Sequence, residues 1–418
     1  MSGLETTVRD LRGAYCAMWW DTGCDTPVLG PPVARRQQRD NARETERLLD
    51  DVAAALEGYP ETEAGRRLWR AELETRVRRF GAERLGWPRG YHSLLFADEF
   101  FESTRAFVRE ARAFDPCVRV DDVGQALRNV WIANSLQLLL ELPIRLSPAI
   151  FGYSMLYPWT DNYLDDPLVS REAKAAFNDA LTRRLNGERC LPASRHERQV
   201  FELVERIEGE HPRAARPAVY ESLLAIQRAQ VASLRQQADG APYESDLLGV
   251  SVEKGGASLL ADAHLVAGTL APGEAEFTFG YGVFLQLLDD LQDAPGDRAL
   301  GHMTVFSQPA GRWPLDRLAS RLYRLIGRVV GESVRFSAPC YEERLDLIRR
   351  NCTLLLVGAV AEHQDLFSRA FSSALEERWP VDFASLRRLR RRAARRYRRT
   401  LARLRRSRGV ASLLDLVA

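Results

Sequence analysis

Lysine is nearly absent from this chain of 418 residues, which contains two lysines against 57 arginines. A residue type used so sparingly marks positions where a compact point charge is needed in place of a planar guanidinium. Lys174 lies in a polar stretch and is expected on the surface. Lys254 precedes Gly255 and Gly256, which allow another group to approach the backbone closely. Lys254 is therefore a candidate functional residue.

Other features that the chain lacks exclude whole classes of protein. The longest apolar stretch, residues 134–156, is interrupted by Glu141, Pro143, Arg145 and Pro148, so no membrane span is expected. No basic and then apolar signal segment opens the sequence. The six cysteines form no CxxC pair and follow no spacing typical of a disulfide framework. Together these absences predict a cytoplasmic protein.

Apolar residues recur at spacings of three and four along most of the chain, as is typical of amphipathic helices, and no run alternates with a period of two. Prolines and glycines fall mainly between these stretches. The expected helices cover residues 35–57, 61–86, 92–113, 119–142, 149–166, 170–186, 196–209, 214–239, 245–270, 273–293, 315–331, 338–375 and 381–408. The sequence therefore predicts an all-α protein, a helical bundle.

Three parts are expected along the chain. Residues 1–34 are rich in glycine and proline and predict an irregular N-terminal arm. Residues 35–380 predict the all-helical domain. Residues 381–418 predict an Arg-rich amphipathic C-terminal helix and tail.

Two clusters of aspartates stand 128 residues apart. The first consists of Asp161, Asp165 and Asp166, and the second of Asp289, Asp290 and Asp293. Each cluster has two carboxylates four residues apart, on one face of a helix, and both lie in apolar surroundings. Like charges in such surroundings are unfavourable unless a cation lies between them. Mg²⁺ fits this role because it binds carboxylate oxygens and keeps positions for water and phosphate. The pattern predicts diphosphate chemistry.

Aromatic side chains precede both clusters. Tyr153, Tyr157 and Asp161 are each one helical turn apart, Trp159 lies between them in sequence, and Phe279 precedes the second cluster. Aromatic faces attract a cation, and an apolar pocket shields it from water. These side chains are therefore expected to line such a pocket.

The acid clusters resemble the two aspartate-rich motifs of the class I trans-isoprenoid synthases. This all-helical superfamily includes prenyl diphosphate synthases, squalene and phytoene synthases and class I terpene cyclases, and the resemblance covers residues 145–305. In that family two facing helices bind three Mg²⁺ ions, which hold the diphosphate of an allylic substrate and promote its departure. The resemblance implies that the metal ligands are Asp161, Asp165, Asp166, Asp289, Asp290 and Asp293. It implies catalytic roles for Asp161, Asp165, Asp289 and Lys254.

The second half of the matched region is closest to the prenyl synthases. Lys254 stands where they carry a Lys-Thr pair, Gln286 precedes the second motif as it does there, and residues 297–304 resemble their Asp-x-x-x-Gly-Lys-x-Thr loop, with His302 at the lysine position. The resemblance and the aromatic pattern together assign substrate binding to Lys254, Arg171, Gln286, Arg298, His302, Tyr153, Tyr157, Trp159 and Phe279.

Three functions are compatible with these motifs. The first motif is closer to the D-x-x-x-D-D of squalene synthases than to the DDxxD of chain elongators, and Arg171 alone stands where elongators carry an arginine pair. These differences favour a terpene synthase that cyclises or rearranges one prenyl diphosphate and releases diphosphate. A prenyltransferase that couples two prenyl units, of squalene-synthase or chain-elongating type, is the alternative. A degenerate member that binds a prenyl diphosphate or lipid without turnover is the non-enzymatic alternative.

The C-terminal helix is strongly basic. Residues 387–408 hold 13 arginines and no acid, so the remainder of the chain carries −11, the net +2 less 13. An apolar stripe runs along it from Leu386 to Leu404. Docking of this stripe on the bundle and peripheral contact with the inner face of an anionic membrane both fit this pattern. Stacking aromatics are scarce there, so no nucleic-acid partner is expected, and a homodimer is left open.

Overall fold

The computed structural model describes residues 3–58, 60, 62–84, 87–88, 97–166, 168–237, 241–332 and 341–408. Helices dominate this part of the chain, and no strand occurs within it, which confirms the all-α class. None of its helices combines the length and apolar character needed to cross a membrane. The helices are α1 (Gly3–Asp21), α2 (Arg35–Glu57), α3 (Glu63–Arg84), α5 (Asp98–Phe114), α6 (Val120–Leu139), α7 (Pro148–Asp165), α8 (Arg171–Leu185), α9 (Arg195–Glu210), α10 (Pro217–Ser233), α11 (Leu247–Ala267), α12 (Pro272–Leu300), α13 (Asp316–Glu332), α14 (Tyr341–Glu362), α15 (Arg369–Glu376) and α16 (Phe383–Arg408).

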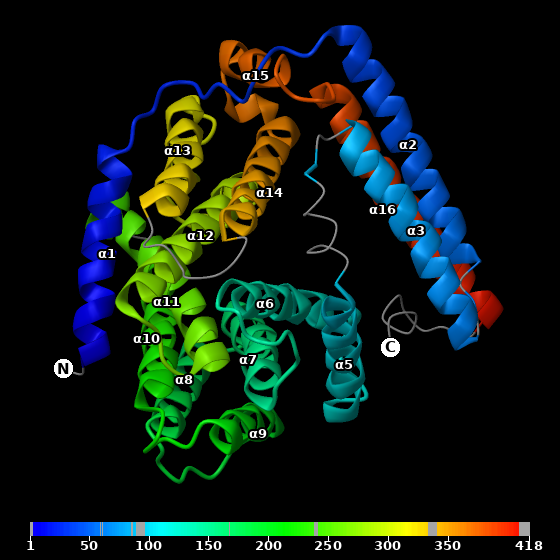
Figure 1. Cartoon of the computed structure of the whole chain (residues 1–418). Coiled ribbons are helices and arrows are strands. Elements are labelled where there is room, and N and C mark those ends of the chain that lie inside the picture. The colour runs from blue at the N-terminus through cyan, green and yellow to red at the C-terminus, as the bar shows by residue number, and fades with distance from the viewer. Residues whose placement is uncertain are drawn as a thin grey trace.

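The N-terminal region is not an irregular arm throughout, because residues 3–21 form helix α1. The prediction is wrong for this stretch, since most of the glycines and prolines that prompted it lie after the helix, in residues 22–34. Val8, Tyr15 and Trp19 of α1 are buried at helical spacing. The Tyr15 hydroxyl donates a hydrogen bond to the Glu276 carbonyl oxygen at 2.9 Å. Residues 22–34 then cross from α1 to α2 (Figure 1).

Two helix boundaries differ from the prediction. Helix α12 continues through Pro295, which the sequence places between helices, and ends at Gly301. That glycine has φ 74°, in the left-handed region that favours glycine after a helix. The single helix expected over residues 338–375 is instead two, α14 and α15. Ser368 begins the second of them, because its Oγ accepts a hydrogen bond from Phe371 N at 3.1 Å.

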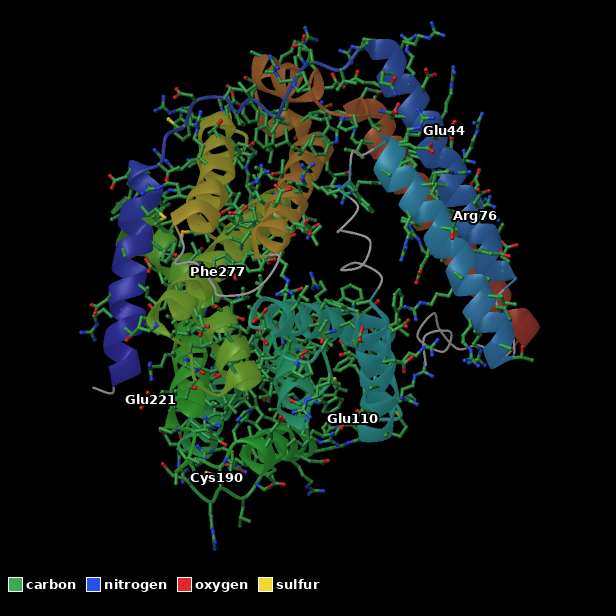
Figure 2. All side chains as sticks on the ribbon, in the orientation of Figure 1. Glu44, Arg76, Glu110, Cys190, Glu221 and Phe277 are labelled. Atoms are coloured by element: carbon green, nitrogen blue, oxygen red, sulfur yellow. The ribbon has the colours of Figure 1, made fainter. Side chains whose placement is uncertain are left out.

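Two hydrophobic cores hold the bundle together. One core includes α1 and the helices from α11 through α14, and the other includes the helices from α5 through α10 (Figure 1). Phe277 lies inside the first core, while Glu44 and Arg76 lie on an arm formed by α2, α3 and α16 (Figure 2). The chain thus folds into a two-core bundle with a three-helix arm beside it.

The basic helix α16 uses its apolar stripe within this arm. Leu389 packs with Ala42 of α2, and Arg392 forms ion pairs with Glu46 and with Asp50, the latter at 2.8 Å. Apolar contact and charge pairing therefore dock α16 on α2, so the helix is not a unit separate from the preceding chain.

Helices α11 and α12 approach each other closely through glycines. A Cβ atom built on Gly255 would lie 2.4 Å from the Gly282 carbonyl oxygen, and one on Gly282 would lie 2.2 Å from that of Gly255. A Cβ on Gly256 would lie 2.3 Å from the Phe279 ring. Non-bonded carbons normally keep about 3.5–4.0 Å apart, so a side chain at these positions would force the helices apart.

We expect Gly282→Ala to lower the free energy of unfolding by about 1–3 kcal/mol, the usual cost of overpacking a core. Gly13→Ala is the matched control, because a Cβ there meets nothing within 4 Å and alanine should stabilise α1 by about 0.5–1 kcal/mol. Urea unfolding followed by circular dichroism measures both. A neutral Gly282→Ala would show that the helices can separate without cost.

Candidate active site

A cleft of about 360 Å³ opens chiefly between α6, α7, α8, α10, α11 and α12. Its volume falls within the range of about 300–1,000 Å³ that is usual for ligand pockets. One acid of each cluster, Asp161 of α7 and Asp289 of α12, lines the cleft together with Lys254 of α11. Residues far apart in the sequence therefore meet at one site.

Helix α7 places Asp161 on one wall. The helix starts after Ser147, whose Oγ accepts a hydrogen bond from Ile150 N at 3.3 Å and caps the first turn. Asp161 lies in its last turn with 8% of its surface exposed, and the Gln230 Nε2 of α10 donates a hydrogen bond to its Oδ1. A carboxylate this buried needs charge compensation in addition to a neutral donor.

The other two acids of the first cluster differ from Asp161. Asp165 belongs to α7, but its side chain lies outside the described residues. Asp166 follows the helix, and its Oδ1 accepts a hydrogen bond from Leu168 N at 2.8 Å. Asp166 does not line the cleft and closes the turn after α7.

Asp289 faces the cleft from α12, two turns after Gly282. Burial raises its pKa to about 6, and the neighbouring Asp293 and Asp290 act in the same direction. Asp289 is exposed at the cleft, yet the surrounding walls remove part of the water that would solvate its charge. The site therefore favours a neutral Asp289 or a cation beside it.

Asp290 and Asp293 do not line the cleft. The Ser251 Oγ donates a hydrogen bond to one Asp290 oxygen at 2.7 Å, and the Gln286 Nε2 donates to the other at 2.9 Å. Asp290 is buried and ties α12 to α11, which is a structural role. Asp293 is exposed one turn beyond Asp289, and its pKa is raised by partial burial and then by Asp297.

Two cations act on the charge of this site. Lys254 and Arg128 both oppose the rise in the pKa of Asp289 and of Tyr157. Arg128 lines the cleft from α6 and was not expected from the sequence. A signal for it existed, since residues 125, 128, 129 and 132 follow the i, i+3, i+4, i+7 pattern of one helix face and all line the cleft.

Of the four expected aromatics, Tyr153 and Tyr157 line the cleft. Burial, and then Asp161, raise the pKa of Tyr157 to about 12, so its hydroxyl stays protonated at neutral pH. The Tyr153 hydroxyl donates a hydrogen bond to the Ser258 carbonyl oxygen at 3.2 Å. Trp159 packs in the core against Phe114 instead.

Phe279, the fourth aromatic, does not line the cleft either. It is fully buried and packs against Tyr15 of α1, with ring centroids 5.7 Å apart. Its ring also lies over Gly256, where a Cβ would collide with it. Phe279 therefore supports the contact of α11 with α12.

Of the four remaining residues expected to bind substrate, one lines the cleft and three do not. Gln286 lines the cleft, whereas Arg171, Arg298 and His302 do not. Arg171 is exposed at the start of α8, and Arg298 is exposed in the last turn of α12. The His302 Nδ1 lies 3.3 Å from an Asp297 carboxylate oxygen. The segment that resembles a diphosphate-binding loop is, in this fold, the end of α12 and its cap.

The donor set suits Mg²⁺ in one particular mode. Within the described part of the chain, no group of three or more His, Cys, Asp or Glu side chains could hold a metal ion. Mg²⁺ is usually bound through one or two carboxylates, with water and substrate phosphates as the remaining ligands. Asp161 and Asp289 offer one carboxylate on each wall, and the raised pKa of Asp289 means that a cation there would be stabilising. The residues fit shared coordination with a phosphate ligand.

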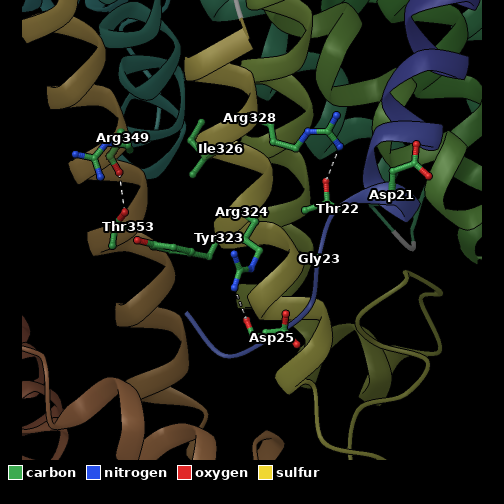
Figure 3. A pocket seen from close by; sticks show the side chains of 11 residues that line it. Asp21, Thr22, Gly23, Asp25, Tyr323, Arg324, Ile326, Arg328, Arg349 and Thr353 are labelled. Carbon is green, nitrogen blue, oxygen red and sulfur yellow. Dashed lines mark hydrogen bonds between the residues drawn. The ribbon is translucent and has the colours of Figure 1, made fainter. Parts of the chain in front are cut away.

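A second, wider cavity of about 790 Å³ lies beside the end of α1, between α13 and α14 (Figure 3). Its arginines hold the end of α1 in place: Arg328 Nη1 donates to the Met18 carbonyl oxygen and to Thr22 Oγ1, both at 3.3 Å. Arg324 Nη2 donates to the Asp25 carbonyl oxygen at 3.4 Å. Cations at a helix C-terminus stabilise its unpaired carbonyls. No expected site residue lines this cavity; Arg324 and Arg328 have this structural role, and Arg349 pairs with Asp346 of its own helix.

Comparisons with known proteins add no identity. No family model matches the sequence, and neither a curated protein nor a solved structure is similar to it. The resemblance to isoprenoid synthases therefore rests on the motif residues of the sequence alone.

The raised pKa of Asp289 predicts how stability depends on pH in the absence of divalent cations. The folded protein keeps this proton up to about pH 6, whereas the unfolded chain releases it near 3.8. Stability therefore falls as pH rises between these values, and the loss persists at higher pH. Asp289→Asn should raise the melting temperature at a pH of about 7.5 and change it little at about 4.5.

Thermal unfolding in EDTA, followed by circular dichroism, measures this difference. Asp179→Asn is the control, since Asp179 is exposed on α8 outside the cleft. The control should shift the melting temperature equally at both pH values. An equal shift of the melting temperature at both pH values for Asp289→Asn would contradict the raised pKa of Asp289.

Proposed function

We propose that this protein is a Mg²⁺-dependent class I terpene synthase that ionises a linear prenyl diphosphate and releases diphosphate. The supporting observation is that Asp161 and Asp289, one from each acid cluster, line a single cleft with Lys254. Bound Mg²⁺ would neutralise the diphosphate charge and so make it a better leaving group.

The residues of the cleft supply the other requirements of this chemistry. Lys254 and Arg128 provide positive charge for diphosphate oxygens. Tyr157 and Tyr153 lie one and two turns before Asp161 and line the cleft where a carbocation would form and move. Leucines of α8 and α10 line the cleft and exclude water from the chain.

A prenyltransferase that couples two prenyl units is the second candidate, and Arg128 favours it. Coupling places a second chain, often with a second diphosphate, in one cavity. The sequence offers Arg171 for that charge, but Arg171 lies outside the cleft. Arg128 lines the cleft from α6, outside both sequence motifs, and supplies a second cation there.

Turnover tests the proposal. Incubation with prenyl diphosphates of 10 to 25 carbons should release diphosphate with Mg²⁺ and not with EDTA. Asp161→Asn and Lys254→Ala should each lower kcat by about a hundredfold or more, the scale of losing one electrostatic contact in a preorganised site. Product mass spectrometry and a diphosphate assay measure the outcome.

The chain offers its own control for Lys254. Lys174 is the other lysine, lies on α8 and does not line the cleft, so Lys174→Ala should leave kcat unchanged. Full turnover in EDTA, or equal effects of the two lysine substitutions on kcat, would contradict the proposed function.

The carbon number of the product separates the two candidates. A terpene synthase converts one prenyl diphosphate into a hydrocarbon or alcohol of unchanged carbon number, with or without isopentenyl diphosphate. Arg128→Ala should then lower kcat while the product mass stays the same, because Arg128 serves a single diphosphate. A product with the summed carbons of two substrates, lost in Arg128→Ala, would establish coupling instead.

A further inference from the structure

Two buried carboxamide side chains line the cleft, and their nitrogens donate hydrogen bonds to residues that do not line it. Asn129 of α6 and Gln227 of α10 line the cleft and are 9% and 6% exposed. The Asn129 Nδ2 donates to Asp262 Oδ1 at 2.9 Å and to Ser154 Oγ at 3.1 Å. The Gln227 Nε2 donates to Asn178 Oδ1 at 2.9 Å. Neither amide oxygen accepts a hydrogen bond from a described residue, so both oxygens remain available as acceptors at the cleft.

The partners behind the wall fix which end of each amide points inward. Asp262 and Asn178 are buried and do not line the cleft. Burial raises the pKa of Asp262 well above its ordinary value and so favours the protonated carboxyl. The Asn129 amide uses both N–H groups on its partners and offers its carbonyl oxygen to a ligand, whereas the Gln227 amide keeps one N–H group in addition to its oxygen. Asp262 is thus a positioning residue for Asn129.

Both acceptors lie away from the acids, in the part of the cleft that a prenyl chain would occupy. Ser154, the partner of Asn129, precedes Asp161 by seven residues on α7, a distance of about 10 Å along the helix. Gln227 precedes Gln230, the donor to Asp161, by about one turn of α10. A purely hydrocarbon chain would cover both oxygens without replacing their hydrogen bonds to water. Each acceptor buried in this way weakens binding by about five- to 150-fold.

We infer that Asn129 and Gln227 hold a hydroxyl or water oxygen beside the prenyl chain, so that the substrate carries a hydroxyl group or the product acquires one from water. This inference rests on the proposed function for the identity of the chain. In the second case the water oxygen bonds to the cationic carbon, one water proton leaves to the departed diphosphate, and an alcohol results. No oxidant or reductant is required.

Binding to the full-length protein without Mg²⁺ tests the inference apart from turnover. Farnesol and 12-hydroxyfarnesol, which differ by a hydroxyl at the far end of the chain, are the probes, with isothermal titration calorimetry as the measurement. The wild-type protein should bind 12-hydroxyfarnesol about tenfold more tightly than farnesol. Asn129→Leu and Gln227→Leu should each lose this preference, because leucine keeps the volume and removes the acceptor.

Gln125→Leu is the matched control. Gln125 lines the cleft from α6, one turn before Asn129, but no described hydrogen bond holds its nitrogen behind the wall. It should keep the preference. Melting temperatures show whether the variants fold. Equal wild-type affinity for the two probes would overturn the assignment to a hydroxyl of the substrate, because a water retained at the two amides would serve both probes equally.

Turnover of a prenyl diphosphate in ¹⁸O-labelled water distinguishes the two sources of oxygen. Label in an alcohol product assigns the acceptors to water. An unlabelled product, together with preferred turnover of the ω-hydroxylated diphosphate, assigns them to a hydroxyl of the substrate. A labelled-water experiment that yields only hydrocarbon, with no preference between substrates, would overturn the inference. Absence of all turnover would defeat the proposed function, while the binding preference would still decide the assignment to a hydroxyl of the substrate.

Discussion

The contact between Gly255 and Gly282 is the constraint on which the cleft depends. It brings the backbones of α11 and α12 together without an intervening side chain. Lys254 directly precedes one glycine, and Asp289 follows the other by two turns, so the spacing between this cation and this carboxylate is set by the helix contact. The bond from Ser251 to Asp290 holds the same two helices. Because Coulomb energy falls with separation, a wider contact would weaken the field of the site.

The aspartates within each acid cluster have different roles, which the sequence motif does not reveal. Asp161 and Asp289 line the cleft, whereas Asp290 accepts two hydrogen bonds inside the bundle and Asp166 closes a turn. Adjacent aspartates on a helix point in directions about 100° apart, so one cluster cannot direct all its carboxylates to one ligand. The raised pKa of Asp289 is consistent with this division, since its acidic neighbours repel its charge without sharing its position.

The sequence predicted most helices to within a few residues, because prolines and glycines mark most of their ends. It predicted the meeting of Asp161, Asp289 and Lys254 only through the resemblance. Helical periodicity shows which residues are apolar but not whether they face a core or a cleft, and so Trp159 and Phe279 were assigned to the cleft although they pack in the cores. Arg128 and Asn129 could not be placed, because their position depends on how α6 packs against α7 and α11.

The second cation in the cleft is compatible with two prenyl chains, whereas the volume of the cleft favours one. A second cation, Arg128, is what a second diphosphate would need. Yet Lys254 and Arg128 act on the same two groups, Asp289 and Tyr157, so in the proposed function they would hold one diphosphate from two helices. A volume of about 360 Å³ is also near the lower end for ligand pockets. One diphosphate held by two cations accounts for both observations, which favours a single chain in the cleft.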